Sequence, residues 1–193
     1  MSRLGSSGET DEILVAQACQ APPGDLRAFN ELMHRHQSRV QTNCRYLSGN
    51  EEDALDLAQE VLVKAYFNLD RFEGRSTFGT WIGRIKVNHC LNHLRRTKGK
   101  DFIDVDEPAL ESEPALHSTA RADARVHTRD TRGRISEVLD GMSDSLRLPL
   151  LMRDMDGLSY QEIADELGVG LSAVKMRIKR AREEFRIAYG QGE

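Results

Sequence analysis

The chain has 193 residues, of which 39% are hydrophobic and 30% are charged, as is usual for one globular domain or two small ones. No apolar run reaches the ~18–20 residues of a membrane-spanning helix, and the N-terminus lacks the apolar core of a secretory signal. Three cysteines (Cys19, Cys44 and Cys90) are too few and too scattered for a disulfide framework. These features predict a cytoplasmic protein with reduced thiols and a disordered tail over residues 1–10.

Charge is sorted into blocks along the chain. The formal net charge of −4, taken alone, argues against a nucleic-acid-binding protein. However, six Lys or Arg and no acid fall within residues 84–100, and six Lys or Arg against two Glu fall within residues 171–186. Five acids and no base fall within residues 51–60, and six acids and no base within residues 101–116. Such blocks indicate several different partners, although each also fits a solvated helix face or linker.

Apolar residues recur with helical spacing along most of the chain, and no strand-like alternation persists. Residues 98–120 break this pattern with an acidic, proline-containing stretch that predicts a flexible linker. The sequence therefore predicts an all-α protein of two small helical domains, at residues 11–97 and 121–189. The predicted helices span residues 11–20, 25–46, 51–69, 77–97 and 121–140, and Ser143 caps a further one that contains Pro149. Their predicted N-caps are Asp25, Asn50 and either Ser76 or Thr77.

Residues 159–180 have the spacing of a helix-turn-helix. Ser159 and Glu162 fit a capping box at the start of the first helix. Gly168 stands where a helix end needs a left-handed residue, and small Ala164 lies ten residues before apolar Val174, as two closely crossing helices require. An αα-hairpin that never meets DNA is the alternative interpretation.

The second helix of this motif divides into two faces. Ser172 is its predicted cap, and an apolar face is formed by Val174, Ile178, Ala181 and Phe185. Off that face lie Lys175, Met176, Lys179, Arg180 and Arg182. A recognition helix needs this division, because its back packs on the domain while long polar side chains reach phosphates and base edges.

The helix predicted at residues 51–69 carries an acidic face. Asp53, Asp56 and Glu60 lie at i, i+3 and i+7 with Gln59 beside them, and the opposite side is apolar. This stripe is either a partner-binding site or a solvated surface.

Residues 69–88 interleave aromatic residues with cations, and basic Arg95 and Arg96 follow. This pattern favours single-stranded nucleic acid, because bases stack on rings while cations hold phosphates. The alternative is that the aromatic residues, Phe72, Phe78 and Trp81, are simply core. Residues 74–79 lack the Gly-Lys-Ser/Thr ending of a phosphate loop.

Catalytic and metal-binding motifs are not indicated. His89 and His93 at i, i+4 with Cys90 between them could form half of a metal site, but no second ligand pair has suitable spacing. No nucleophile motif is present in the sequence. We therefore expect neither an enzyme nor a cofactor, a metal or a small-molecule substrate.

Taken together, in this order, the segments resemble the extracytoplasmic-function (ECF) group of bacterial sigma factors over residues 11–188. The most specific segments are DLAQE at 56–60, KAY at 64–66, FEGRSTFGTWIGRIKVN at 72–88, LRR at 94–96, RDMDGLSYQEIA at 153–164 and VKMRIKRAR at 174–182. The resemblance implies that the first domain is sigma region 2 and that the second is sigma region 4.

The resemblance also implies a division of labour between residues. The polymerase-binding residues would be Asp53, Asp56, Gln59 and Glu60, which dock on the clamp helices of the β′ subunit. Those at the −10 element would be Phe72, Ser76, Phe78, Arg84, Lys86, Asn88, Arg95 and Arg96. Those at the −35 element would be Ser172, Lys175, Met176, Lys179, Arg180 and Arg182. Core RNA polymerase (including its β flap), promoter DNA and an anti-sigma factor are the expected partners, and the linker would thread through polymerase.

Two departures from the family pattern bear on these expectations. Leu55 stands where the family often has an acid, and Met176 stands where a small polar residue is common, which leaves the −35 sequence open. No extension follows Glu193, so we expect any sensing domain to be on another protein.

Two rival functions remain. A dimeric helix-turn-helix regulator would bind a palindrome without polymerase. This hypothesis leaves residues 53–88 without a role. A sigma mimic that sequesters an anti-sigma factor should have lost its DNA-facing cations, which this chain keeps.

Overall fold

The computed structural model describes residues 9–99 and 128–190, and within these ranges all regular structure is helical. This confirms the predicted all-α class. The helices in chain order are α1 (Asp11–Gln20), α2 (Arg27–Ser48), α3 (Glu51–Phe67), the short 3₁₀ helix η1 (Leu69–Arg71), α4 (Phe78–Thr97), α5 (Thr128–Gly141), α6 (Asp144–Asp154), α7 (Tyr160–Leu167) and α8 (Leu171–Gly190). None of them is both long and apolar enough to cross a membrane.

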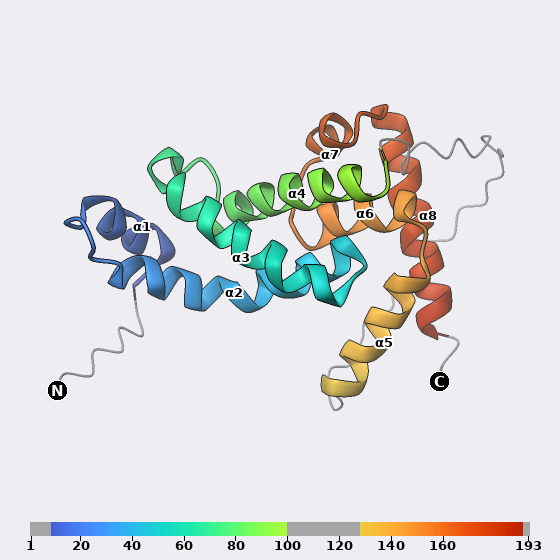
Figure 1. Ribbon diagram of the computed structural model, residues 1–193. Helices are drawn as coiled ribbons and strands as arrows, with labels where there is room; N and C mark the ends of the chain where they lie inside the picture. The colour runs from blue at the N-terminus through green and yellow to red at the C-terminus, as the bar shows by residue number, and fades with distance from the viewer. Residues whose placement is uncertain (1–8, 100–127, 191–193) are drawn as a thin grey trace.

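Helices α2, α3 and α4 pack side by side, and α1 packs against the N-terminal end of α2 (Figure 1). The break between α2 and α3 is local in origin. Gly49 ends α2 in a left-handed conformation with φ of 70°, and the Asn50 side chain then accepts a hydrogen bond of 2.9 Å from the Glu52 amide. Thr77 caps α4 in the same way, through a 3.2 Å hydrogen bond from the Thr80 amide. The predicted caps Asn50 and Thr77 are thus confirmed.

Two other predicted helix starts differ from the structure. Helix α2 begins at Arg27 rather than at the residue after Asp25, because the Asp25 carboxylate accepts bonds from the amide and guanidinium of Arg27 in a local turn. Helix α8 begins at Leu171, so Ser172 lies in its first turn and not before it. The predicted tail and linker, and residues 121–127 of a predicted helix, lie largely outside the described residues.

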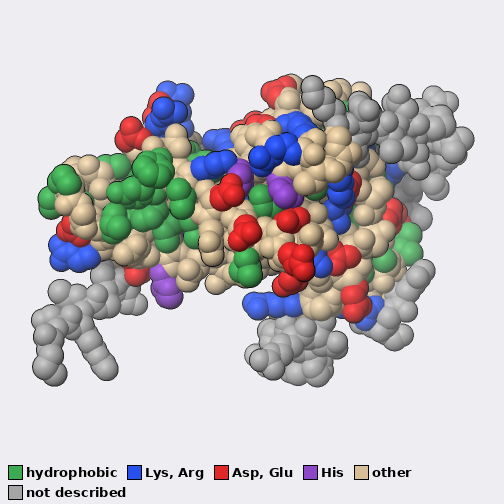
Figure 2. Space-filling view, viewed as in Figure 1, with side chains coloured by type: hydrophobic (Ala, Val, Ile, Leu, Met, Phe, Trp, Pro, Cys, Tyr) green, Lys and Arg blue, Asp and Glu red, His purple; other side chains and the backbone are tan. Residues whose placement is uncertain are grey.

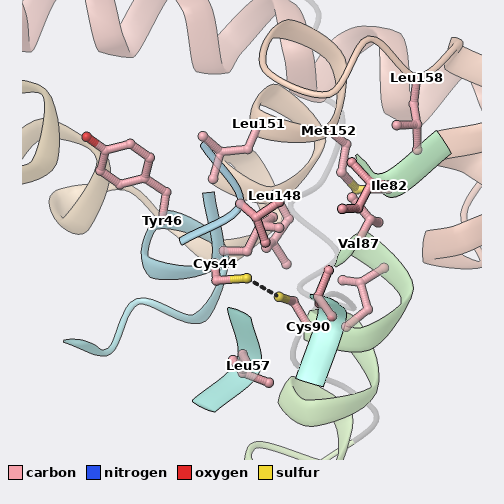
Figure 3. Close-up of a cluster of buried hydrophobic side chains, with 14 of the residues drawn as sticks. Cys44, Tyr46, Leu57, Ile82, Val87, Cys90, Leu148, Leu151, Met152 and Leu158 are labelled. Carbon is pink, nitrogen blue, oxygen red and sulfur yellow. Dashed lines mark hydrogen bonds between the residues drawn. The ribbon is translucent and has the colours of Figure 1, made fainter. Parts of the chain in front are cut away.

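The buried hydrophobic core continues from the N-terminal helices into the C-terminal ones. Figure 3 shows Leu148, Leu151 and Met152 of α6 facing side chains of α2 and α4, among them Cys44 and Cys90. The Sγ atoms of these two cysteines lie 3.8 Å apart, and all three cysteines are free thiols. The two sets of helices therefore pack together through α6.

Candidate nucleic-acid and polymerase interfaces

The acidic residues of α3 lie on one open face of the molecule. Figure 2 shows them along α3 with histidine side chains beside them. Asp56, Gln59 and Glu60 are exposed, whereas Asp53 is half-buried. His89 of α4 lies 2.8 Å from Glu60, and His93 lies 3.2 Å from Asp53. The two histidines that resembled half of a metal site thus each face an acid of α3, and no cluster of three metal-ligating side chains occurs in the described parts of the chain.

The same stripe continues into apolar side chains that the sequence analysis did not assign. Val63 and Phe67 follow Asp53, Asp56 and Glu60 at alternating spacings of three and four residues, so the five positions share one helix face. Phe67 is 74% exposed and Val63 is 55% exposed. This spacing in the sequence could have revealed the extension. A mixed acidic and apolar stripe of this kind suits packing against another helix.

The aromatic residues near the start of α4 form a cluster. The ring centroids of Phe72, Phe78 and Trp81 lie 5.4–5.8 Å apart, and each pair is tilted or edge-on. Phe78 is completely buried, whereas Phe72, Trp81 and Ser76 are half-buried. Phe78 thus belongs to the hydrophobic core in this conformation. Near this cluster, Phe72 and Ser76 are the predicted −10 residues that are partly exposed.

Three of the four predicted DNA-facing cations of α4 are engaged by the C-terminal part of the chain. Lys86 is 1% exposed and forms an ion pair with Asp156. Arg84 forms a 2.6 Å ion pair with Glu162, and Arg95 donates a 2.5 Å hydrogen bond to the carbonyl of Glu166. Asn88 and Arg96, the other predicted members of this face, are exposed.

Helices α7 and α8 form the predicted helix-turn-helix. Ser159 and Glu162 make both hydrogen bonds of the capping box, and Gly168 ends α7 with φ of 72°. These bonds from Ser159, aided by Arg84, hold the pKa of the Glu162 carboxyl below its usual range. Ala164 and Val174 are buried where the two helices pack.

The outer face of α8 carries the predicted −35 residues. Ser172, Lys175, Met176 and Lys179 are exposed, and Arg180 is half-buried. Arg182 is exposed but forms a bidentate pair with Asp154 of α6, at 2.5 and 3.0 Å. Of the apolar back that sequence spacing predicted, Val174, Ile178 and Ala181 are buried and Phe185 is half-buried.

Comparisons with known proteins agree with this arrangement. Residues 32–100 match the family model of Sigma-70 region 2, and residues 132–185 match that of Sigma-70 region 4. The chain is 35% identical to the ECF RNA polymerase sigma-E factor of Escherichia coli K12, over 90% of this chain and 91% of the relative. It is 32% identical to the ECF RNA polymerase sigma-E factor of Haemophilus influenzae, over 90% and 92% of the two chains.

Two solved structures have the same fold. One is CnrH in complex with the cytosolic domain of CnrY, with a TM-score of 0.58, 26% identity and coverage of 96% of this chain and 100% of that one. The other is the sigma factor RpoE of Bartonella quintana in complex with the anti-sigma factor NepR, with a TM-score of 0.57, 23% identity and coverage of 86% and 98%. On this sequence and family evidence, the chain belongs to the ECF group of RNA polymerase sigma factors.

Proposed function

We propose that this chain binds core RNA polymerase through α3, engages the −10 element with the N-terminal end of α4, and reads the −35 element with α8. Its family makes it a transcription initiation factor and not an enzyme. The observation that carries the residue-level proposal is that the acidic and apolar stripe on α3 and the lysine-bearing outer face of α8 are both exposed. Below, region 2 denotes residues 9–99 and region 4 denotes residues 128–190.

Polymerase binding is assigned to the stripe on α3. Asp56 and Glu60 can make charge-assisted hydrogen bonds to Arg or Lys on a clamp helix of the β′ subunit. Phe67 adds a large exposed apolar side chain at one end of the stripe, where a partner helix would remove it from water. The β flap is the corresponding partner proposed for region 4.

Engagement of the −10 element is assigned to the aromatic cluster and to α4. A base flipped out of the melted strand would stack near Phe72 and Ser76, in the loop before α4, and the exposed Asn88 of α4 is assigned to the same strand. The cations of α4, namely Arg84, Lys86, Arg95 and Arg96, would hold the backbone. Binding the flipped base offsets an unstacking cost of about a few kcal/mol, so promoter melting needs no nucleotide hydrolysis.

Reading of the −35 element is assigned to α8. Lys175, Met176 and Lys179 project from an exposed face whose back is anchored by buried Val174 and Ile178. Such a helix can enter the major groove, where Arg and Lys read guanine edges or contact phosphates.

The rival functions leave features of the molecule without a role. A regulator that acts without polymerase does not need an exposed Phe67 in register with three acids on α3. A mimic that only sequesters an anti-sigma factor does not need cations on the outer face of α8. We place the activity in the cytoplasm, where core polymerase and promoter DNA meet.

An anti-sigma factor is the proposed regulator of this chain, as one fold neighbour is bound to such a protein. A groove of about 680 Å³ runs between α2 and region 4, lined in part by Tyr46, Ile135, Leu139, Leu150 and Phe185. Its largely apolar lining could receive an amphipathic helix. Recovery of a small protein with the tagged chain from unstressed cells, and loss of that protein on Ile135→Asp at a half-buried position of the groove, would support this assignment. A chain that is recovered alone while its promoters are silent would refute it.

Run-off transcription tests the proposed function directly. Purified chain and core polymerase are incubated with genomic fragments, and the start sites are mapped. We expect starts that depend on the chain and share a two-part upstream sequence. Tight binding to a palindrome without any polymerase-dependent starts would instead support the rival regulator.

A further inference from the structure

Asp156, in the turn after α6, is inserted into region 2. Its carboxylate accepts a 3.0 Å hydrogen bond from Asn43 of α2 and forms an ion pair with Lys86 of α4. The side chains of Asp156 and Lys86 are 3% and 1% exposed. Gly83 of α4 lies beside this carboxylate, since a Cβ atom at that position would be in ordinary van der Waals contact with the Asp156 Cβ, at 3.6 Å. The contact is thus a fitted, water-excluded joint between the two regions.

The polar contacts around this joint share one pattern: region 2 supplies the cations and region 4 supplies the acceptors. Arg84 pairs with Glu162 at 2.6 Å, Lys98 pairs with Asp144 at 2.6 Å, and Arg95 donates to the Glu166 carbonyl. A fourth pair joins Arg45 to Asp140 through two bonds of 2.7 and 3.0 Å. Region 4 therefore presents oxygen atoms to three of the side chains assigned above to the DNA backbone, namely Arg84, Lys86 and Arg95.

We propose that this arrangement is an autoinhibited state, in which Asp156 of region 4 occupies the place of a promoter phosphate at Lys86. The proposal rests on the function assigned above. A side chain that is 1% exposed cannot contact DNA, so region 4 must leave region 2 before Lys86 can act. The α3 stripe and the outer face of α8 stay exposed, so polymerase and the −35 element can be engaged before that opening.

The composition of the joint suits a reversible closure. Its peripheral ion pairs are partly exposed, and such pairs contribute little net stability. The buried pair of Lys86 and Asp156 adds less net stability than its Coulomb attraction alone suggests, because both charges lose their hydration. It instead specifies one register, since either charge is costly if left buried alone. DNA or polymerase can therefore displace region 4 from the cations of region 2.

A reversible cross-link tests whether closure blocks function. The double variant Gly83→Cys/Asp156→Cys has a Cβ separation of 3.6 Å, within the range of about 3.5–4.5 Å for a disulfide. A Cys19→Ser background removes the exposed native thiol. Oxidation with a disulfide reagent should form the cross-link, located by peptide mass mapping. We expect the oxidised protein to lose run-off transcription at least about tenfold and to recover it on reduction, because a covalent bond keeps region 4 over Lys86 whereas an ion pair can be exchanged.

Several outcomes would overturn the proposal. One is a mapped cross-link together with transcription that is as high in the oxidised protein as in the reduced one. The single variant Gly83→Cys controls for effects of the oxidant. Inactivity of reduced and oxidised forms alike, with the cross-link mapped, would refute the proposed function and this proposal with it; activity of the oxidised form refutes autoinhibition alone.

A charge variant provides an independent measurement. Asp156→Ala should separate the regions, seen as a larger distance between fluorophores on α3 and α8, and should raise transcription at limiting chain severalfold. Glu137→Gln removes an exposed acid of α5 and should leave both quantities as in the parent. An Asp156→Ala protein with unchanged distance and unchanged transcription would contradict autoinhibition.

Discussion

Helices α3 and α4 of region 2 each carry a charged face, and the two faces differ in what covers them. Asp56 and Glu60 of α3 face solvent, whereas Lys86 of α4 is enclosed by region 4. Both faces are equally visible as charge blocks in the sequence. The comparison teaches that a charge block marks a candidate contact, but that a neighbouring domain decides whether the contact is available.

The largest expected effect is the loss of unfolding free energy at Phe78, which distinguishes a core residue from a contact residue. This side chain is completely buried, so Phe78→Ala should lower the free energy of unfolding by about 3–5 kcal/mol. Urea denaturation followed by circular dichroism measures this. Phe72→Ala, at a half-buried position of the same cluster, should cost clearly less. Equal small losses for both variants would mean that Phe78 is a surface residue and not core.

The open face of α3 is tested by charge reversal. Asp56→Lys/Glu60→Lys should weaken binding to core polymerase by about 2–3 kcal/mol, because charge-assisted contacts become repulsive. The unfolding free energy should change by less than about 0.5 kcal/mol, since both side chains are exposed. The matched reversal Glu12→Lys/Glu137→Lys, at exposed acids away from α3, controls for net charge. Undiminished co-purification of the α3 variant with core enzyme would exclude this face.

Helix α8 extends the comparison to region 4, where Lys175 and Lys179 face solvent and Arg180 is half-buried. If Arg180 reads a base, Arg180→Ala should cost about 1–3 kcal/mol and relax specificity at one position. Lys179→Ala should weaken binding about equally on all sequences if it holds a phosphate. Affinities on single-base variants of the −35 element distinguish the two patterns. Unchanged affinity of both variants on every duplex would remove α8 from the DNA interface.

Phe67 tests whether the α3 stripe continues beyond its acids. Phe67→Ala should lower the affinity for core polymerase by about 1–2 kcal/mol, as expected when an exposed aromatic side chain is buried by a partner. The side chain is 74% exposed in the free chain, so thermal unfolding should hardly shift. The control is Ile187→Ala, an exposed apolar side chain of α8. Equal polymerase affinities for the two variants would confine the interface to the acids.

The smallest effect concerns pH and the histidine beneath the α3 stripe. Burial, with Lys64 nearby, lowers the pKa of His89 below its usual value near 6.5. The unfolded chain therefore binds this proton more readily than the folded one, and stability is lost as pH falls from about 6.5 through the folded pKa. His89→Gln should flatten the stability curve between pH 7 and 5, in contrast to His34→Gln at an exposed site. Parallel curves for parent and His89→Gln would rule out this contribution.

Most of the secondary structure and many candidate residues could be predicted because their causes are local. The capping box of Ser159 and Glu162 and the left-handed Gly168 each depend on residues within a few positions. The two faces of α8 follow from helical spacing alone. The misplaced helix starts at Asp25 and Ser172 are also local, because a turn and a helix compete for the same few backbone groups.

The amino-acid order is thus sufficient to specify the helices, the helix-turn-helix, and which side chains share a face, since these depend on short-range geometry. It does not reveal that Lys86 meets Asp156, seventy positions away, or that Phe78 supports a cluster from below. The first arises when the turn after α6 packs against α2 and α4. The second arises within region 2, where Phe78 packs against His36 of α2, because burial and ion pairing depend on which surfaces come together. The charge blocks mark candidate contact faces of region 2, and the packing of region 4 decides which of those faces are exposed.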